Sequence, residues 1–257
     1  MIEIQHISQA YGSYDVLKDV SLNIQENKIT ALIGANGAGK TTLLNVAANL
    51  IPAKGGQVLL DGVNIQELKN VEIAKKIAVL KQMQHLSMRI TIRELIAFGR
   101  YPHCKGRLRS GDEEKIREAI SYMDLQDIEN KFIDELSGGQ RQRAYIAMIL
   151  AQDTKYIFLD EPLNNLDIKY SVEMMHILQR LVRELNKTVI IVLHDINFAA
   201  AFADQIVAMR NGMLISEGEA RSIIDQGTLQ EVFDYNFHIV EIGKRKVCVY
   251  FQPDSAP

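Results

Sequence analysis

The sequence is poor in cysteine, carries little net charge and lacks any long apolar run. Its two cysteines, Cys104 and Cys248, lie far apart and outside any C-x-x-C pattern, which indicates a reducing compartment and argues against a structural zinc site. A net charge of −3 gives no overall positive field, so we expect no nucleic-acid partner. The N-terminal residues alternate like a strand, without the apolar segment of a signal peptide. The longest apolar runs, at 145–151 and 188–193, are too short for a bilayer, which takes about 20 residues, so we expect the chain to stay in the cytoplasm.

Strand-like and helix-like segments alternate along most of the chain. Apolar, strand-like runs occur at 28–34, 57–62, 77–82, 155–160 and 187–194. Helical patterns follow the first of these runs at 40–50, before Pro52, and the fourth at 168–186. This alternation predicts an α/β core with a mainly parallel sheet. From about 83 to 152 the strand signals give way to helical ones, which predicts a helical insertion into that core.

A glycine-rich stretch, G-A-N-G-A-G-K-T-T, spans residues 34–42. It fits G-x-x-x-x-G-K-[ST], starting at Gly34 and ending with Lys40 and Thr41, between a strand signal and a helix signal. Glycines let backbone N–H groups surround phosphate oxygens, and a helix start adds partial positive charge. The lysine reaches the β- and γ-phosphates and the threonine hydroxyl reaches Mg²⁺. The dinucleotide pattern G-x-G-x-x-G fails because Asn36 replaces its second glycine, so the stretch predicts a nucleoside-triphosphate site.

Two carboxylates, Asp160 and Glu161, end the strand-like run Y-I-F-L-D-E-P. Parallel α/β sheets bind ligands at the carboxyl ends of their strands. We therefore expect Asp160 to join the Mg²⁺ shell and Glu161 to orient and deprotonate the attacking water. Taken alone, D-E-P could equally be a polar strand end and turn. His194 closes the next apolar run and could touch the γ-phosphate, although a histidine in such a place is commonly structural.

A second glycine loop, L-S-G-G-Q, occupies residues 136–140 and contains no lysine. A helical pattern follows it directly. Its serine hydroxyl, its backbone N–H groups and the helix start can stabilise γ-phosphate charge. The loop therefore suits a helper that completes a phosphate site begun elsewhere.

Taken in order, the 34–42 loop, Gln82, L-S-G-G-Q, L-D-E-P and His194 resemble an ATPase subunit of an ABC transporter. The resemblance runs from Tyr11 to at least Gly218, and L-S-G-G-Q is highly specific to that family. It implies an α/β fold: a P-loop NTPase core with a mainly parallel sheet, an antiparallel β subdomain and a helical subdomain. The expected division is a single ABC ATPase domain over 1–257, with the helical subdomain at about 83–152.

The resemblance also implies how the two glycine loops cooperate, with ATP and Mg²⁺ as cofactors. In this family two subunits meet head to tail, and each ATP lies between the lysine loop of one subunit and the S-G-G-Q loop of the other. Tyr11 would stack on adenine, with Tyr14 a weaker candidate. Asp167 would cross the interface, where Asn164-Asn165 departs from the usual threonine or serine before the leucine.

The site residues implied by the resemblance fall into three groups. Those expected to bind the nucleotide are Tyr11, Gly34, Asn36, Gly37, Ala38, Gly39, Lys40, Thr41, Thr42, Ser137, Gly138, Gly139, Gln140 and Asp160. Those expected to bind the metal are Thr41, Gln82 and Asp160. Those expected to act in catalysis are Glu161, His194 and Gln82, the last through Mg²⁺ and the attacking water.

The stretch T-I-R-E-L-I-A-F-G-R-Y-P-H at 91–103 resembles ATPase subunits of importers for iron–siderophores, haem and cobalamin. Iron–siderophore import is the leading expectation, with membrane permease subunits and a homodimer as partners and a substrate-binding protein as an indirect one. The chain is then peripheral, on the cytoplasmic face of the cell membrane. The alternatives are another cargo (haem, cobalamin, a metal or an exported substrate), a soluble ABC ATPase of DNA repair or translation, and an ordinary P-loop kinase. That kinase would lack L-S-G-G-Q.

Overall fold

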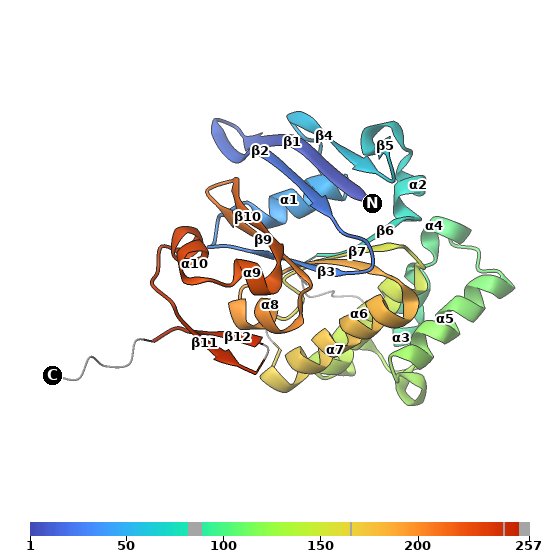
Figure 1. Ribbon diagram of the computed structural model, residues 1–257. Helices are drawn as coiled ribbons and strands as arrows, with labels where there is room; N and C mark the ends of the chain where they lie inside the picture. Colours follow the sequence, from blue (N-terminus) through green and yellow to red (C-terminus); the bar gives the residue numbers. More distant parts are fainter. Residues whose placement is uncertain (82–88, 165, 244, 252–257) are drawn as a thin grey trace.

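A mainly parallel sheet forms the centre of the computed structural model, which describes residues 1–81, 89–164, 166–243 and 245–251 (Figure 1). Its strand order is β10-β9-β3-β8-β7-β6, and neighbouring strands run parallel except β9 and β10. The strands are β3 (Ile29–Ile33), β6 (Ile77–Leu80), β7 (Tyr156–Asp160), β8 (Thr188–Val192), β9 (Gln205–Arg210) and β10 (Met213–Glu219). Every residue of β3, β7 and β8 is buried, which explains their continuous apolar runs. The predicted α/β fold with a mainly parallel sheet is confirmed.

An antiparallel sheet near the N-terminus lies over the central sheet, with α1 (Lys40–Ala47) between them (Figure 1). Its order is β2-β1-β4-β5, with β1 (Ile2–Tyr11), β2 (Tyr14–Ile24), β4 (Gly55–Leu60) and β5 (Val63–Asn64). Ile4 of β1, Leu43 of α1 and Phe158 of β7 share one apolar core. Helix α1 ends at Ala47 rather than at the predicted residue 50, because Asn49 adopts a left-handed φ of 55° and takes the chain out of the helix before Pro52.

Helices occupy the described chain between β6 and β7: α3 (Ile92–Phe98), α4 (Tyr101–Cys104), α5 (Ser110–Tyr122) and α6 (Gly138–Ala151). Helix α6 packs against both α3 and α5. Arg100 is buried with Asp112, Nε to Oδ1 at 3.0 Å, and it also donates to the Ala151 carbonyl at 2.7 Å. These bonds tie the chain before α5 to the end of α6. The division into one domain with a helical subdomain at about 83–152 stays a prediction.

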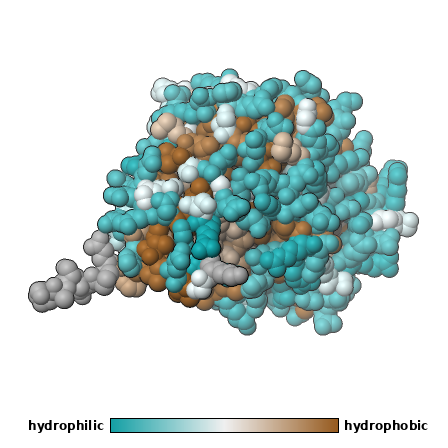
Figure 2. Space-filling view, in the orientation of Figure 1, coloured by the Kyte–Doolittle hydropathy of each residue, from teal (hydrophilic) through white to brown (hydrophobic). Residues whose placement is uncertain are grey.

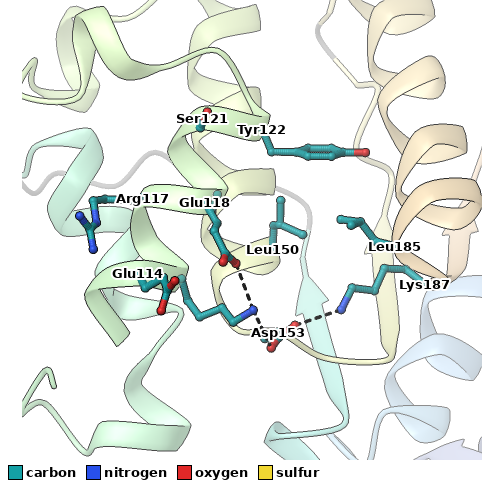
Figure 3. Close-up of a pocket in the computed structure, with 11 residues that line it drawn as sticks. Glu114, Arg117, Glu118, Ser121, Tyr122, Leu150, Asp153, Leu185 and Lys187 are labelled. Atoms are coloured by element: carbon teal, nitrogen blue, oxygen red, sulfur yellow. Dashed lines mark hydrogen bonds and ion pairs between the residues drawn. The ribbon is translucent and has the colours of Figure 1, made fainter. Parts of the chain in front are cut away.

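A cavity of about 780 Å³ lies where α5 meets the ends of α6 and α7 (Ile168–Leu185) (Figure 3). The carboxylate of Asp153 lies between two lysines, 3.5 Å from Lys115 Nζ and 3.3 Å from Lys187 Nζ. Figure 3 shows Asp153 facing Lys187. Nearby, the Tyr122 hydroxyl donates to Glu184 at 2.9 Å. The contacts of Lys115 and Tyr122 join α5 to the ends of α6 and α7, and each of the two partly exposed ion pairs contributes at most about 1 kcal/mol.

Helices α7 and α8 (Ile196–Phe202) cover the face of the central sheet opposite α1. Residues of β3 alternate between the two cores, Ala31 facing the α7–α8 side and Leu32 the α1 side. The chain closes with α9 (Ala220–Ile223), α10 (Gln226–Phe233) and a hairpin of β11 (His238–Ile242) and β12 (Arg245–Val249). The remaining short elements are α2 (Asn70–Ala74) and 3₁₀ turns at Ile65–Glu67, Gln126–Ile128 and Ile133–Glu135.

Hydrophilic residues cover most of the face seen in Figure 2, while apolar residues gather near the C-terminal hairpin. Ile242 and Phe251 are among the exposed apolar side chains there. Across the ranges that the structure describes, no helix is both long and apolar enough to cross a bilayer.

Candidate active site

The 34–39 loop connects the end of β3 to the start of α1, where the sequence predicts the phosphate-binding loop. Gly34 has a φ of 149°, and a Cβ there would lie 2.2 Å from the Met209 carbonyl oxygen of the neighbouring strand β9. Gly39 caps α1 with a φ of 98°, and a Cβ there would lie 2.9 Å from the Val16 carbonyl oxygen. Glycine is therefore required at both ends of the loop. Between them, residues 35–37 are exposed, so the loop presents its backbone to solvent.

Lys40 is only 5% exposed although it carries the charge of the loop. Its Nζ donates to the carbonyl oxygens of Gly34 at 2.8 Å and Ala35 at 3.0 Å. Burial lowers the pKa of Lys40, while the carboxylates of Glu161 and Asp160 act in the opposite direction. The ammonium group is thus folded onto its own loop and lies in the field of the two acidic residues that end β7.

Asp160, at the end of β7, meets Thr41, which follows β3, across the one strand between them, β8; Thr41 Oγ1 donates to Asp160 Oδ1 at 2.8 Å. The register explains the meeting: Leu32 of β3 pairs with Val192 of β8, which in turn pairs with Asp160. The carboxyl ends of these strands therefore lie at the same level. Burial raises the pKa of Asp160. The negative charge of Glu161 raises this pKa further, while the hydrogen bond from Thr41 lowers it. Two oxygen ligands of the kind that Mg²⁺ prefers are already side by side.

Glu161 and His194 form the second pair of the site. His194 Nε2 lies 2.6 Å from Glu161 Oε1, and the Asn164 amide donates to Glu161 Oε2 at 2.6 Å. Glu161 adopts a φ of 51°, uncommon for a residue with a side chain, immediately after the strand ends. The three residues line a cavity of about 290 Å³. The sequence placed Glu161 and His194 at strand ends, but the contact between them follows only from β7 and β8 being neighbours.

Ser137 is the N-cap of α6 and forms a capping box with Gln140. Its Oγ accepts from the Gln140 N–H at 3.3 Å, and the Gln140 side chain accepts from the Ser137 N–H at 3.1 Å. Gly139 is buried under Tyr170, and a Cβ at Gly139 would lie 2.6 Å from that ring. Ser137 and Gly138 stay exposed. Among the described residues, no hydrogen bond or ion pair joins this loop to the 34–42 loop.

A contact that the sequence did not suggest links α6 to the acidic turn. The buried Gln142 side chain donates to the Pro162 carbonyl at 2.9 Å. The partners are separated by 20 residues, and no local spacing signals such a bond. The hydrogen bond from Asn164 to Glu161 is a different case. The two residues lie three positions apart directly after a strand end, and this spacing could have indicated their bond.

A family model described as "ABC transporter" matches residues 17–164, which is more than half of the chain. The chain belongs to the ABC transporter family. The resemblance read from the two glycine loops and the acidic strand end is thereby confirmed, and with it the assignment as an ATPase subunit.

The ABC transporter ATPase has close relatives along nearly its whole length. It is 49% identical over 251 residues to the petrobactin import ATP-binding protein YclP of Bacillus subtilis (strain 168), covering 98% of this chain and 100% of the relative. It is 36% identical over 241 residues to the iron(3+)-hydroxamate import ATP-binding protein FhuC of the same organism, covering 93% of this chain and 90% of the relative. Among solved structures, it is similar to the dimeric structure of MJ0796, a bacterial ABC transporter cassette, with a TM-score of 0.74, 31% identity, and coverage of 86% and 99%.

The structure describes some, but not all, of the remaining residues that the sequence predicts for the site of this ABC transporter ATPase. Tyr11 and Tyr14 face each other at the turn between β1 and β2, 55% and 68% exposed, so either ring is accessible to a base. Asp167 is the N-cap residue of α7. Gln82, predicted to contact Mg²⁺ and the attacking water, lies outside the described residues, as does Asn165.

Proposed function

We propose that this ATPase powers the import of iron–siderophore complexes across the cell membrane. The observation that carries the proposal is the end-to-end match to an import ATP-binding protein for petrobactin, supported by the match to one for iron(3+)-hydroxamate. The 91–103 stretch, which resembles this importer branch, forms α3 and the start of α4. The chain works as a peripheral subunit on the cytoplasmic face, bound to permease subunits that receive cargo from a substrate-binding protein.

The 34–42 loop is the proposed site for the phosphates of ATP. Within the described residues, Lys40 Nζ donates only to carbonyl oxygens, so phosphate oxygens are better partners for its charge than the present ones. Exposed backbone at 35–37 and the first turn of α1 supply N–H groups to the same phosphates. Tyr11 is proposed to stack on the adenine.

Thr41 and Asp160 are the proposed protein ligands of Mg²⁺, together with Gln82. The described residues hold no cluster of three or more histidine, cysteine or acidic side chains suited to a metal. Mg²⁺ does not need one, because it is commonly held by one or two protein oxygens, phosphate oxygens and water. The hydroxyl and carboxylate that now bond to each other fit this donor set. Such an ion neutralises charge on the phosphates during transfer.

Glu161 is the proposed general base, with His194 as its partner. The close contact with His194 and the hydrogen bond from Asn164 hold both carboxylate oxygens of Glu161. A carboxylate held in this way can orient a water molecule and accept its proton. His194, 39% exposed at its side chain, can also reach the γ-phosphate.

The Ser137–Gln140 loop is proposed to serve the ATP bound by a second copy of the chain. Its serine and first glycine face solvent, it has no lysine, and in the described chain it makes no bond to its own 34–42 loop. The similar cassette MJ0796 was solved as a dimer. A head-to-tail homodimer brings the loop of one copy over the phosphates held by the other, so ATP stabilises the dimer and hydrolysis releases it.

Uptake of ⁵⁵Fe-labelled siderophore tests the transport proposal. Cells lacking this subunit are complemented with the wild-type chain, with Glu161→Gln, or with Glu114→Gln, a matched change at an exposed glutamate on α5. We expect uptake with the wild type and Glu114→Gln and a loss with Glu161→Gln. Uptake that survives without the subunit, or a defect confined to haem or cobalamin, contradicts the proposal.

A further inference from the structure

The C-terminal hairpin packs along α8, the helix that begins directly after His194 and Asp195. It lies outside residues 17–164, the range matched by the family model. The side-chain amide of Asn197, on α8, makes two hydrogen bonds to the backbone of Cys248 in β12. The Cys248 N–H donates to Asn197 Oδ1 at 2.7 Å, and Asn197 Nδ2 donates to the Cys248 carbonyl at 3.0 Å. The hairpin is therefore docked by specific polar bonds as well as by apolar packing.

Tyr250, just past β12, bonds to the residue next to His194. Its hydroxyl donates to Asp195 Oδ1 at 3.0 Å and accepts from Asn197 Nδ2 at 3.2 Å. The direction is fixed, because a carboxylate only accepts hydrogen bonds and an amide NH₂ only donates them. Burial and the negative charge of Asp195 raise the pKa of Tyr250, so the phenol keeps its proton at neutral pH.

Asp195 also starts α8, since the same Oδ1 accepts from the N–H groups of Asn197 at 2.7 Å and Phe198 at 3.4 Å. On the other side of His194, the Leu193 N–H donates to the Leu32 carbonyl in β3 at 3.1 Å. The backbone of His194 is thus anchored before and after the residue. Its imidazole is partly exposed, so these anchors and the contact with Glu161 decide where Nε2 lies.

We propose that Tyr250 is a positioning residue for ATP hydrolysis, which acts through Asp195 to hold His194 against Glu161. The inference rests on the catalytic role proposed above for His194. Without the phenol hydroxyl, Asp195 keeps its bonds to α8 but loses its tie to the hairpin, so the turn that carries His194 is less restrained. A small displacement of a catalytic group lowers kcat more than it weakens the binding of substrate.

The test compares Tyr250→Phe with Tyr122→Phe in the purified full-length chain. Both changes remove a phenol hydroxyl that donates to a carboxylate, and Tyr122 bonds to Glu184 on another part of the surface. We expect Tyr250→Phe to lower kcat about five-fold, with KM for ATP within about two-fold, from the loss of one hydrogen bond to a charged group. Tyr122→Phe should leave both constants unchanged, and both variants should melt near the wild-type temperature.

A spectroscopic readout separates positioning from general stability. In ¹⁵N-histidine-labelled chain, the ring signals of His194 are identified by their loss in His194→Gln. Tyr250→Phe should shift those signals, and Tyr122→Phe should not. Unmoved His194 signals, or equal effects of the two phenylalanine variants on kcat, overturn the inference. If His194→Gln itself hydrolyses ATP at the wild-type rate, the proposed role of His194 fails instead, so the two failures are distinguishable.

Discussion

His194 Nε2 lies 2.6 Å from Glu161 Oε1, and the two residues follow neighbouring parallel strands, β8 and β7. The sheet order alone brings them together, since 33 positions separate them in the sequence. With Asn164 on the other carboxylate oxygen, Glu161 is fixed beside the loop that carries Lys40. This arrangement suits the general base proposed for Glu161, because side chains of the same chain hold both of its carboxylate oxygens.

Glu161→Gln should bind ATP and scarcely hydrolyse it. The amide keeps the shape and can still bond to His194 and Asn164, but it cannot accept the proton of the attacking water. We expect kcat to fall about a hundred-fold or more, the usual contribution of a general base. Phosphate release and the Kd of a fluorescent ATP analogue measure the two effects, with Glu114→Gln as the control. Near-normal turnover in Glu161→Gln removes Glu161 from the catalytic role.

Thr41→Val should weaken the use of Mg²⁺ more than the binding of ATP itself. Valine has the same shape but lacks the hydroxyl that now donates to Asp160. We expect the Mg²⁺ concentration for half-maximal ATPase activity to rise about ten-fold, the scale of losing one oxygen ligand or its support. Thr228→Val is the control, because it makes the same side-chain change in the first turn of another helix, α10, where the Thr228 backbone N–H donates to Asp225 away from the site. An unchanged Mg²⁺ requirement in Thr41→Val contradicts the metal assignment.

Glu26 should make the folded chain sensitive to acid. Its carboxylate accepts from Lys155 Nζ at 2.6 Å and from the Tyr156 hydroxyl at 3.0 Å. The Lys155 bond first, then the bond from the N-terminal ammonium group, lowers the pKa of Glu26 from 4.5 to about 2. A lowered folded-state pKa stabilises the fold fully above the ordinary value and loses that contribution as the pH falls toward 2.

Melting temperatures of the wild type and Glu26→Gln from pH 7 to pH 2 measure this contribution. The wild type should melt at a higher temperature than Glu26→Gln. This difference in melting temperature should be constant above about pH 5 and should become smaller below the ordinary glutamate pKa. Glu114→Gln should follow the wild type throughout. A difference in melting temperature that stays constant down to pH 2 rules out the stabilising role assigned to the bond between Lys155 and Glu26.

The parts of the site that depend on contiguous residues could be predicted from the sequence. The phosphate loop is one such part, because the chemistry of Gly34, Lys40 and Thr41 lies within a single strand–loop–helix unit. The capping-box start at Ser137 is another, since its partner is three residues away. Contacts between distant segments were not predictable. The Glu161–His194 bond needs the strand order, and the Gln142–Pro162 and Tyr250–Asp195 bonds need the packing of whole helices.

In the proposed dimer, each ATP site combines the 34–42 loop of one copy with the Ser137–Gln140 loop of the other. A Lys40→Ala chain and a Ser137→Arg chain are each expected to be inactive, because each spoils both sites of its own homodimer. Mixed in one dimer, they form one site with an intact lysine loop and an intact serine loop, and one site that lacks both.

ATPase activity of the equimolar mixture, with heterodimers verified by differently tagged chains, is therefore the most direct measurement. We expect recovery to about a quarter of wild-type activity, since about half of the dimers are mixed and each has one intact site. Verified heterodimers that stay as inactive as the separate variants at every mixing ratio would contradict it.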